Sequence, residues 1–590
     1  MSNESCTRPV EPAAEPPQYR RHAFSLFLVT LALHAVLVFY NWKQGFLPGH
    51  EFRQTQTALS IAFIEQDHDY SLAYPTPLFG PPWSVPMEFP LYQWSAAWIG
   101  QTTGWSVPVS ARTVSLLCFY LCLPALGLLL KDFGFGAAAR WSGLSLVLCT
   151  PIYIFYTRAV LIESMALMFT LWFVLAFSRM CRHRSWGWLA VAAVAATAAS
   201  LVKVTSMMAW CIGPAIGGLW WSWREWRQGG WSAWRKSVLM GVSCAMPPGI
   251  ASIWWVQTAD AIKATSPGGQ SLISSNLTGF NFGTWSDRLE LDKLAQILSN
   301  ISTGIAPLWV IVITGVLGIL AGRRLHNWRG PIALCWFVAV VFAFPVLYRI
   351  HDYYFYAIAM LTIVSVISGI EFAVRRFKLP GARVWLVLFV ALTQLHAYKL
   401  AYWPGHSLPS NGGSQLHRLI HDALPVDGVI IVLGEDWSSS TAYYSRRRCF
   451  MIREQMLHFQ EESLQEMEGL KDVKISALLT SGIRRDSNYM IDHITARFGL
   501  DPEPTASTPS EDLYVSKRLR REFLKHLAIF PNYGDTQSIE RPPPPIPEIT
   551  DEIIADREIH PVTTNQAATR FVSFSPRPFQ YRAQFGFSSE

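Results

Sequence analysis

The stretch RTVSLLCFYLCLPALGLLL, residues 112–130, and the stretch AARWSGLSLVLCTPIYIF, residues 138–155, decide the class of fold. A helix that crosses the hydrocarbon core of a bilayer needs about 20 predominantly apolar residues, and both stretches have close to that length. Each contains a single charged residue, Arg112 or Arg140, near its beginning. The two stretches therefore predict two membrane-spanning helices joined by a short loop.

Similar apolar runs recur along the chain and together predict an all-α polytopic membrane protein with about eleven transmembrane helices. The fifth and sixth runs meet at Lys203 with almost no loop between them. The runs lie near 23–40, 112–130, 138–155, 160–178, 186–202, 206–223, 237–256, 304–321, 331–348, 353–372 and 383–400.

The composition excludes several other classes of protein. Of the 590 residues, 51% are hydrophobic and 15% are charged, whereas soluble proteins carry about 25% charged residues. A mean hydropathy of +0.21 also excludes a wholly disordered chain. The net charge of +7 does not indicate a nucleic-acid partner, because the Lys and Arg residues lie in short loops between apolar runs, where they set orientation. The nine cysteines lie mostly inside apolar runs, so no disulfide framework is expected.

Alternate loops between the runs are basic, and this pattern predicts the orientation in the membrane. Residues 1–22 are expected to form a cytoplasmic tail, and eleven spans then place the C-terminal region on the outer side of a cell inner membrane. The multi-pass domain is expected to cover 23–402, with large outer loops at 41–110 and 257–303.

The two outer loops and the C-terminal part have different characters. Residues 54–64 and 91–99 are amphipathic and could lie along the membrane surface. Residues 257–303 are predicted to form a mobile polar loop. Residues 403–530 predict a small extracytoplasmic α/β domain, and the Pro-rich tail 531–590 is expected to be disordered. Strands are expected at Val429–Leu433, Ile475–Thr480 and Leu513–Ser516, and helices at Ser414–Ala423 and Glu461–Leu470.

The first outer loop contains two acidic candidates for catalysis. Glu51 lies in GHEFRQTQTA, residues 49–58, at the expected start of a helix. It could simply favour the helix dipole with Arg53 as a surface partner, or it could act as a general base. Glu88 lies between Met87 and Phe89, and an acid in such an apolar setting needs a cationic partner.

Aromatic residues surround Glu88 in GPPWSVPMEFPLYQW, residues 80–94. Trp83 and Tyr92 could belong to the interfacial aromatic belt or contribute to substrate binding. Arg53 is the corresponding charged candidate for substrate binding in this loop.

Three cations, Arg158, Lys203 and Arg349, fall at the outer ends of apolar runs. Each alone could extend its charged end to the interface. Together they would suit a phosphate or diphosphate, because Arg offers a bidentate fork and Lys a point charge. Arg158 could also form a buried pair with Glu163.

His351 and Asp352 follow Arg349 directly and are candidates for substrate or metal binding. No second His or carboxylate stands beside them at ligand spacing, so a divalent metal is only an option. The sequence contains no Walker loop, no dinucleotide-binding glycine motif and no G-x-S-x-G, so nucleotide-driven transport and hydrolase chemistry are not supported.

These features resemble the GT-C membrane glycosyltransferases, in the group that includes protein O-mannosyltransferases and the lipid A aminoarabinose transferase. The resemblance is carried by HEFRQTQTA at 50–58, by PWS and EFPLYQW at 82–84 and 88–94, and by Arg112. It covers about residues 20–400. Relatives often have an Asp-centred motif in this loop, whereas here His50 precedes Glu51, so either Glu51 or Glu88 could be the base.

The resemblance implies inverting transfer of one hexosyl or pentosyl unit from a polyprenyl-phosphate donor to a lipid, glycan or protein acceptor of the cell envelope. It implies a phosphate-binding role for Arg158, Lys203 and Arg349. A flippase of lipid-linked sugars would use the same cations without chemistry, although no inverted repeat supports it. A non-catalytic envelope protein that binds a partner through its C-terminal domain is a third class.

Overall fold

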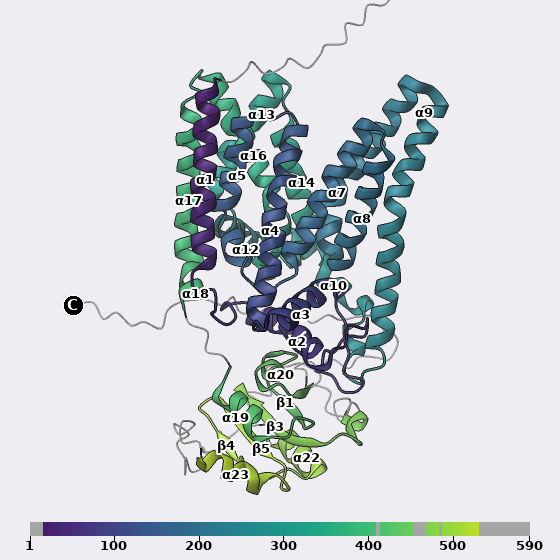
Figure 1. Cartoon of the computed structure of the whole chain (residues 1–590), viewed down its shortest axis with the longest axis vertical. Coiled ribbons are helices and arrows are strands. Elements are labelled where there is room, and N and C mark those ends of the chain that lie inside the picture. Colours follow the sequence, from purple (N-terminus) through teal and green to yellow (C-terminus); the bar gives the residue numbers. More distant parts are fainter. Residues whose placement is uncertain (1–15, 409–412, 453–466, 483–486, 530–590) are drawn as a thin grey trace, which may run out of the picture.

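The computed structural model describes residues 16–408, 413–452, 467–482 and 487–529. Long helices form a bundle, and a small sheet region, residues 413–529, lies at one end of it (Figure 1). The first helix, α1 (Pro17–Phe39), begins at the end of the bundle far from the sheet (Figure 1). The predicted tail 531–590 lies outside the described residues.

All eleven predicted spans are helical, so the fold is that of an all-α polytopic membrane protein. They correspond to α1, α4 (Val107–Asp132), α5 (Ala137–Cys149) with α6 (Pro151–Tyr156), α7 (Glu163–His183), α8 (Trp186–Val202), the two arms of α9 (Val204–Lys263), α13 (Leu308–Leu325), α14 (Arg329–Ala343) with α15 (Pro345–Ile350), the 3-10 helix η3 (Asp352–Ala357) with α16 (Ala359–Arg376), and α17 (Ala382–Ala401).

Several spans are interrupted by a break in the helix. Fewer helices than spans are therefore long enough to cross a bilayer on their own. Among the described residues, five helices meet that length and hydropathy, or six if the pair α12 and α13, bent by 89°, is one span. Helices α5 and α14 end just before Pro151 and Pro345, because proline has no N–H to continue the helical ladder. The two arms of α9 are joined at Gly230, which has φ 66°, a conformation that glycine adopts without strain.

The first outer loop contains the two expected helices, α2 (Glu51–Asp67) and α3 (Leu91–Thr103). The prediction that 54–64 lies along the membrane surface is wrong. Consecutive residues from Thr57 to Ile64 are buried, because α2 packs between the bundle and the sheet region (Figure 1). This position brings the start of α2 close to both parts of the molecule.

The second outer loop is also structured, in contrast to the prediction of a mobile loop. It contains two 3-10 helices and three α-helices, connected by short turns. They are η1 (Gln270–Leu272), η2 (Ser274–Leu277), α10 (Thr278–Phe282), α11 (Trp285–Leu289) and α12 (Leu291–Gly304). The polar residues that favoured a loop lie in turns and helix caps. One example is the capping box of Thr284 and Asp287.

The sheet region confirms the predicted small α/β fold. Its five strands have the order β2-β1-β3-β5-β4, with parallel pairs at β2-β1 and β1-β3 and antiparallel pairs at β3-β5 and β5-β4. The three expected strands are present, and the short strands β2 and β4 were not predicted. The elements are α19 (Gln415–Ala423), β1 (Val429–Leu433), α20 (Ser440–Ser445), β2 (Arg448–Ile452), η5 (Met467–Leu470), β3 (Ile475–Ser481), α22 (Asn488–Phe498), β4 (Ala506–Ser507), β5 (Glu511–Val515) and α23 (Arg520–Ile529). The start of the expected helix 461–470 lies outside the described residues.

The first outer loop attaches the sheet to the bundle through backbone hydrogen bonds. Phe79 pairs in antiparallel fashion with Phe450 of the edge strand β2. The N–H groups of Cys449 and Met451 donate to the carbonyls of Pro77 and Leu78 at 3.0 and 2.9 Å. An edge strand would otherwise expose unpaired N–H and C=O groups. The loop therefore completes the sheet and fixes it against the helices.

Candidate functional site

A half-buried carboxylate, Asp352, connects four distant segments at the sheet end of the bundle. Its Oδ1 accepts hydrogen bonds from the Tyr156 hydroxyl at 2.6 Å and from His50 Nε2 at 2.9 Å. Its Oδ2 accepts one from the Tyr402 hydroxyl at 2.6 Å. These contacts hold His50 in place against the ends of the helices.

Lys203 forms a second buried contact of the same site. It occupies the extended junction between α8 and α9, with φ −159°, and its Nζ donates to Glu163 Oε1. Its ammonium lies 4.4 Å from the ring centroid of Tyr354 and 5.4 Å from that of Tyr353. The predicted pair of Arg158 with Glu163 is wrong, because Glu163 lies beside Lys203 instead.

Arg53 and Glu88 form the third contact. Their side chains are 17% and 19% exposed and joined by an ion pair. Burial opposes the charge of Arg53, but Glu88, and more weakly Tyr353 and Glu163, raise its pKa above the usual value. The N–H of Phe89, next to Glu88, donates to the carbonyl of Leu201 at 3.3 Å, two residues before Lys203, so the Arg53 pair lies beside the Lys203 pair. We call His50, Arg53, Glu88, Glu163, Lys203 and Asp352 the polar cluster.

His351 lies against the polar cluster and forms no ion pair with the other described residues. Its ring centroid is 5.7 Å from that of His50 and 5.1 Å from that of Tyr353. Burial, together with the nearby charge of His50, lowers the pKa of His351 to about 3. His351 is therefore a neutral imidazole at neutral pH and could accept or donate a hydrogen bond to a polar ligand.

Glu51 occupies the first turn of α2, one residue beyond His50, and faces the sheet region. Its Oε1 accepts a hydrogen bond of 2.6 Å from the hydroxyl of Tyr444 in α20. Beside it, the rings of Phe52 and Trp437 meet at a centroid distance of 5.1 Å. Glu51 is exposed and has no cationic partner among the described residues, whereas Glu88 pairs with Arg53. Of the two acidic candidates, Glu51 is thus the one that remains accessible to a substrate.

Tyr444 is a site residue that the sequence analysis missed. Its ring stacks on that of His417, with centroids 6.1 Å apart and planes 10° apart, and a Cβ at Gly413 would lie only 2.6 Å from Tyr444 Cγ. A glycine at 413 is therefore needed for this close approach. No local motif marks Tyr444, because its partner Glu51 is 393 residues away.

Arg158 is buried and engaged by the scaffold. Its guanidinium donates to the carbonyl of Asn41 at 2.9 Å and also contacts the Tyr40 carbonyl and His406. Arg112 lies beneath it, and its Nε donates to the carbonyl of Arg158 at 2.8 Å. Within the described part of the chain, neither guanidinium pairs with a carboxylate. Both are held by backbone carbonyls of the scaffold.

The remaining predicted site residues lie apart from the polar cluster. Arg349 forms an ion pair of 3.5 Å with Asp287 of the second outer loop. Trp83 packs against the core of the sheet region, and Arg448 lies 5.8 Å from its ring centroid. Tyr92 is buried, and its hydroxyl contacts the Ala111 carbonyl and the Ser115 hydroxyl, both at 2.8 Å. The structure shows no direct contact among Arg158, Lys203 and Arg349.

A small cavity opens between the polar cluster and the sheet region. It has a volume of about 30 Å³, which is room for about one or two waters. Arg53 and Glu88 line it from the bundle side, and Trp437 and Ser439 line it from the sheet side.

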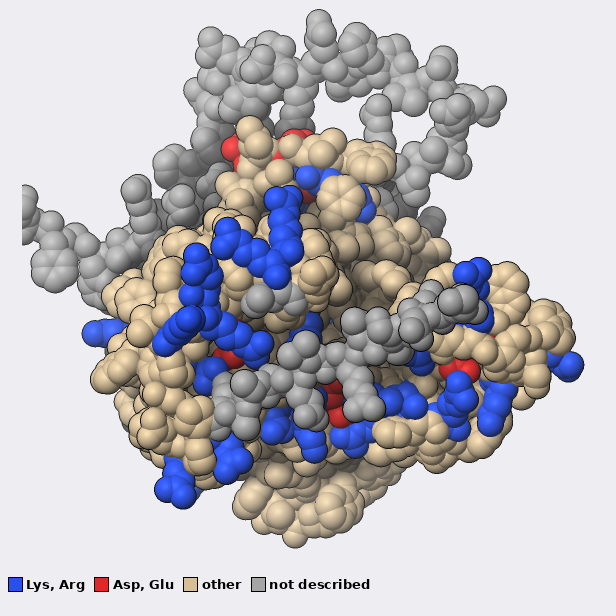
Figure 2. Space-filling view, turned by 90° about the horizontal axis from the view of Figure 1, so that it is seen from above, with Lys and Arg blue, Asp and Glu red and all other residues tan. Residues whose placement is uncertain are grey.

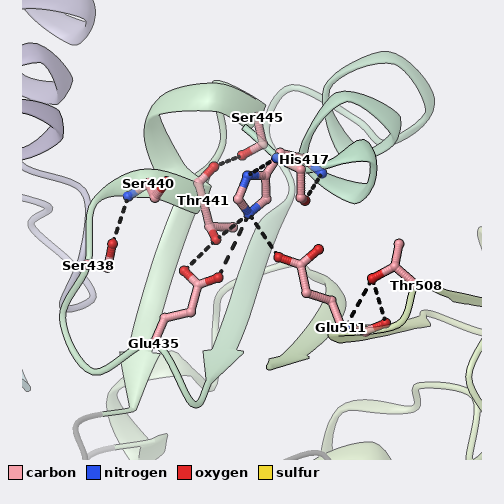
Figure 3. Close-up of polar contacts among 9 residues, drawn as sticks. His417, Glu435, Ser438, Ser440, Thr441, Ser445, Thr508 and Glu511 are labelled. Carbon is pink, nitrogen blue, oxygen red and sulfur yellow. Dashed lines mark hydrogen bonds and ion pairs between the residues drawn. The ribbon is translucent and has the colours of Figure 1, made fainter. Parts of the chain in front are cut away.

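One group of side chains has the spacing of a metal site, at His417, Glu435 and Glu511 (Figure 3). His417 Nε2 is 3.9 Å from the nearest oxygen of each carboxylate. However, the N–H of Ser414 donates to His417 Nδ1 at 3.2 Å, so Nδ1 carries no proton. A metal-bound histidine normally donates its other ring N–H, and a neutral ring with unprotonated Nδ1 carries its proton on Nε2. The residues therefore do not fit a metal ion.

His417 and Glu435 are instead joined by hydrogen bonds through Thr441. His417 Nε2 lies 2.9 Å from the Thr441 hydroxyl, which donates to Glu435 Oε2 at 2.7 Å (Figure 3). Thr441 belongs to α20, the helix that carries Tyr444. The His417 group therefore holds α20, and through it Tyr444, at the start of α2.

This arrangement predicts how the sheet region responds to metals. Treatment of the purified protein with EDTA, followed by addition of ZnCl₂, is expected to leave the midpoint of thermal unfolding unchanged. His417→Gln is expected to lower the midpoint equally with and without zinc, because it breaks the hydrogen bonds to Ser414 and Thr441. Stabilisation by zinc in the wild type that is lost in His417→Gln would contradict the hydrogen-bonded assignment.

The hydroxyl of Tyr444 predicts a second effect. Tyr444→Phe keeps the ring on His417 and removes the hydroxyl that donates to Glu51, a hydrogen bond worth roughly 1.5 kcal/mol when the acceptor is charged. We expect turnover in a sugar-transfer assay to fall about tenfold with unchanged thermal unfolding. Tyr489→Phe, at an exposed tyrosine of α22, is the matched control and should behave as the wild type. Equal turnover of the two variants would show that Tyr444 does not position Glu51.

Comparison with solved structures identifies the fold as that of the GT-C membrane glycosyltransferases. ArnT from Cupriavidus metallidurans bound to undecaprenyl phosphate is similar with a TM-score of 0.53 and 10% identity, covering 82% of this chain and 97% of ArnT. The apo state of ArnT gives a TM-score of 0.52 with 11% identity over the same shares.

The oligosaccharyltransferase of Archaeoglobus fulgidus in complex with Zn and sulfate gives a TM-score of 0.50 with 10% identity, covering 79% of this chain and 69% of that protein. No family model and no curated protein sequence matches the chain. At these identities the comparisons establish the fold.

Proposed function

We propose that the protein is an inverting glycosyltransferase that moves one sugar from a polyprenyl-phosphate donor to an envelope lipid, glycan or protein. The observation that carries the proposal is the accessible carboxylate of Glu51 at the edge of a buried, cation-containing polar cluster. The fold supports it, since one protein with this fold was solved with undecaprenyl phosphate bound.

Glu51 is proposed as the general base. It takes a proton from the acceptor hydroxyl or amine as that atom bonds to the anomeric carbon from the face opposite the phosphate. The bond between the anomeric carbon and the phosphate oxygen breaks, and the polyprenyl phosphate leaves with the electron pair. The leaving group is already an anion, so cations that stabilise it matter more than an acid that protonates it. Glu88 is not favoured as the base, because it is held by Arg53.

Lys203 is proposed to bind the donor phosphate, with Arg53 beside it. Both side chains pair with carboxylates of the polar cluster, and a phosphate would compete with those acids for the same N–H donors. Arg349 of α15 lies apart from these two side chains and pairs with Asp287 of the second outer loop. Arg158 acts from below through its charge, because its N–H groups are used by backbone carbonyls.

The site is proposed to open to the outer side of a cell inner membrane, with the N-terminus in the cytoplasm. Lys and Arg side chains gather on the end of the bundle opposite the sheet (Figure 2). Helices α4, α7, α13 and α16 all end in basic residues. Basic residues favour the cytoplasmic side, so the sheet region and the polar cluster would face outward.

The proposal is tested by incubating the purified protein with a polyprenyl phosphate that carries a tritiated sugar and with a cell-envelope extract. We expect label to move into the extract only when the intact protein is present. A separate test of orientation uses inside-out membrane vesicles that contain the protein. Protease added to the outer solution should leave the sheet region uncut. A panel of hexosyl and pentosyl donors without any transfer would overturn the proposed enzyme, whereas cleavage of the sheet region would overturn only the orientation.

A further inference from the structure

A long apolar groove runs along the side of the bundle between α1, α4 and α5, away from the polar cluster. Its volume is about 820 Å³, and its lining includes Phe27, Leu31 and Phe39 of α1 and Leu123 of α4. The α1 residues span 12 positions, which corresponds to about 18 Å along a helix. Only 22% of the apolar window of α1 is buried inside the protein, so this side of the bundle faces the bilayer.

The shape of the groove follows from two residues of α4. Pro124 lies inside the helix and Gly127 lies one turn later, so this part of α4 presents little side-chain volume. A Cβ added at Gly127 would meet only Leu144 Cδ1, at 3.5 Å, which is an ordinary contact. The space beside Gly127 is therefore open rather than filled by the neighbouring helix.

The lining of the groove contains one cationic side chain, that of Arg140. Of the 12 lining residues, Tyr120, Arg140 and Trp141 carry polar groups, and Arg140 alone is charged. The Tyr120 hydroxyl already contacts His34 Nδ1 at 3.2 Å. Arg140, near the start of α5, forms no ion pair or hydrogen bond of its side chain that is recorded for the described part of the chain, and its Nε is buried without a partner. Trp141, next to it, packs on Phe24 and Phe27 with ring centroids 5.0 Å apart.

We infer that the groove is a binding site for one anionic phospholipid, with an acyl chain along α1 and the phosphate on Arg140. The apolar lining matches a hydrocarbon chain, and the unpaired guanidinium matches a phosphate. A transmembrane helix of a partner protein fits less well, because such contacts are built on small residues whereas Phe27, Leu31, Phe39 and Leu123 are large. The inference does not depend on the proposed glycosyl transfer.

The position of Arg140 separates this lipid from the proposed donor. Helix α4 runs from the sheet end to the opposite end of the bundle (Figure 1), and Arg140 lies in the first turn of α5, which follows it, whereas Lys203 and Glu51 lie at the sheet end. A donor whose phosphate is held by Lys203 cannot place the same phosphate on Arg140. The two lipids therefore occupy different sites.

The test is native mass spectrometry of the purified full-length protein with phosphatidylglycerol or phosphatidylethanolamine of identical chains. One Arg near an anionic headgroup is worth about a fivefold change in binding. We expect the wild type to retain phosphatidylglycerol about fivefold better than phosphatidylethanolamine, and Arg140→Gln to lose that preference. Arg324→Gln, at an exposed arginine that ends α13, is the matched control and should keep it.

A second variant tests the position of the chain. Gly127→Leu is expected to reduce retention of both lipids, because the leucine enters the groove, without lowering the midpoint of thermal unfolding. Unchanged lipid preference in Arg140→Gln, or equal loss in Arg324→Gln, would overturn the site. Unchanged retention in Gly127→Leu would overturn the groove as the place of the chain. Displacement of phosphatidylglycerol by one equivalent of polyprenyl phosphate would show that the occupant is the donor lipid instead.

Discussion

Glu51→Gln is expected to lower the rate of sugar transfer by two to four orders of magnitude, the usual contribution of a general base. Glutamine keeps the shape of the side chain and can still contact the Tyr444 hydroxyl, but it cannot take a proton from the acceptor. Affinity for the polyprenyl-phosphate donor should stay within about twofold. Lys203, which is proposed to bind the donor phosphate, pairs with Glu163 and not with Glu51. Transfer rate and donor affinity are measured on the same protein preparation.

Two controls make the Glu51 result specific. Asp67→Asn neutralises an exposed acid at the other end of the same helix and should transfer at the rate of the wild type. Glu88→Gln tests the other acid of the first loop and should act mainly by releasing Arg53 from its ion pair. If Glu51→Gln retained more than about a tenth of the wild-type rate while Glu88→Gln lost nearly all of it, the base would be Glu88.

Lys203→Met is expected to damage both stability and donor binding. Lys203 and Glu163 are 8% and 3% exposed, and removal of one partner of a buried pair typically costs about 3–5 kcal/mol because the other charge is left unpaired. Loss of one charged donor to the phosphate of the leaving group should also reduce transfer about a hundredfold. Thermal unfolding and transfer are the two measurements.

The double variant Lys203→Met/Glu163→Leu separates the two effects. Removal of both charges should restore the midpoint of thermal unfolding but leave transfer low, because no cation replaces Lys203. Lys263→Met removes another buried lysine, which pairs with Asp260 at 3.3 Å outside the polar cluster. It should lower stability without weakening donor binding. Recovery of transfer in the double variant would show that Lys203 serves only the fold.

The apolar runs predicted the helical bundle well, because a bilayer demands length and hydropathy that are visible in any 20-residue window. The interruptions were less predictable. Pro151 and Pro345 lie inside the predicted spans and cut α5 and α14 short. The buried position of α2 could not be read from its amphipathic pattern, since burial on its second side comes from a sheet region that begins more than 340 residues later.

The sequence predicted several residues of the site but not which of them pair with each other. Charged residues at the sheet-side ends of the spans, such as Lys203 and Asp352, do take part in the polar cluster. Their partners are set by how the helices pack, so Glu163 meets Lys203 and not Arg158, and Asp352 meets His50 across 302 positions. Tyr444 had no signal in the sequence, because a tyrosine gains its role only from the contact with α2.

The measurement that tests the central proposal most directly is the stoichiometry of transfer in proteoliposomes with a donor labelled in both the sugar and the lipid. The proposal predicts that each sugar found on the acceptor is matched by one free polyprenyl phosphate, and that Glu51→Gln abolishes both products while still binding the donor. Intact donor that crosses the bilayer in wild type and variant alike, with no free polyprenyl phosphate released, would contradict it and identify a flippase.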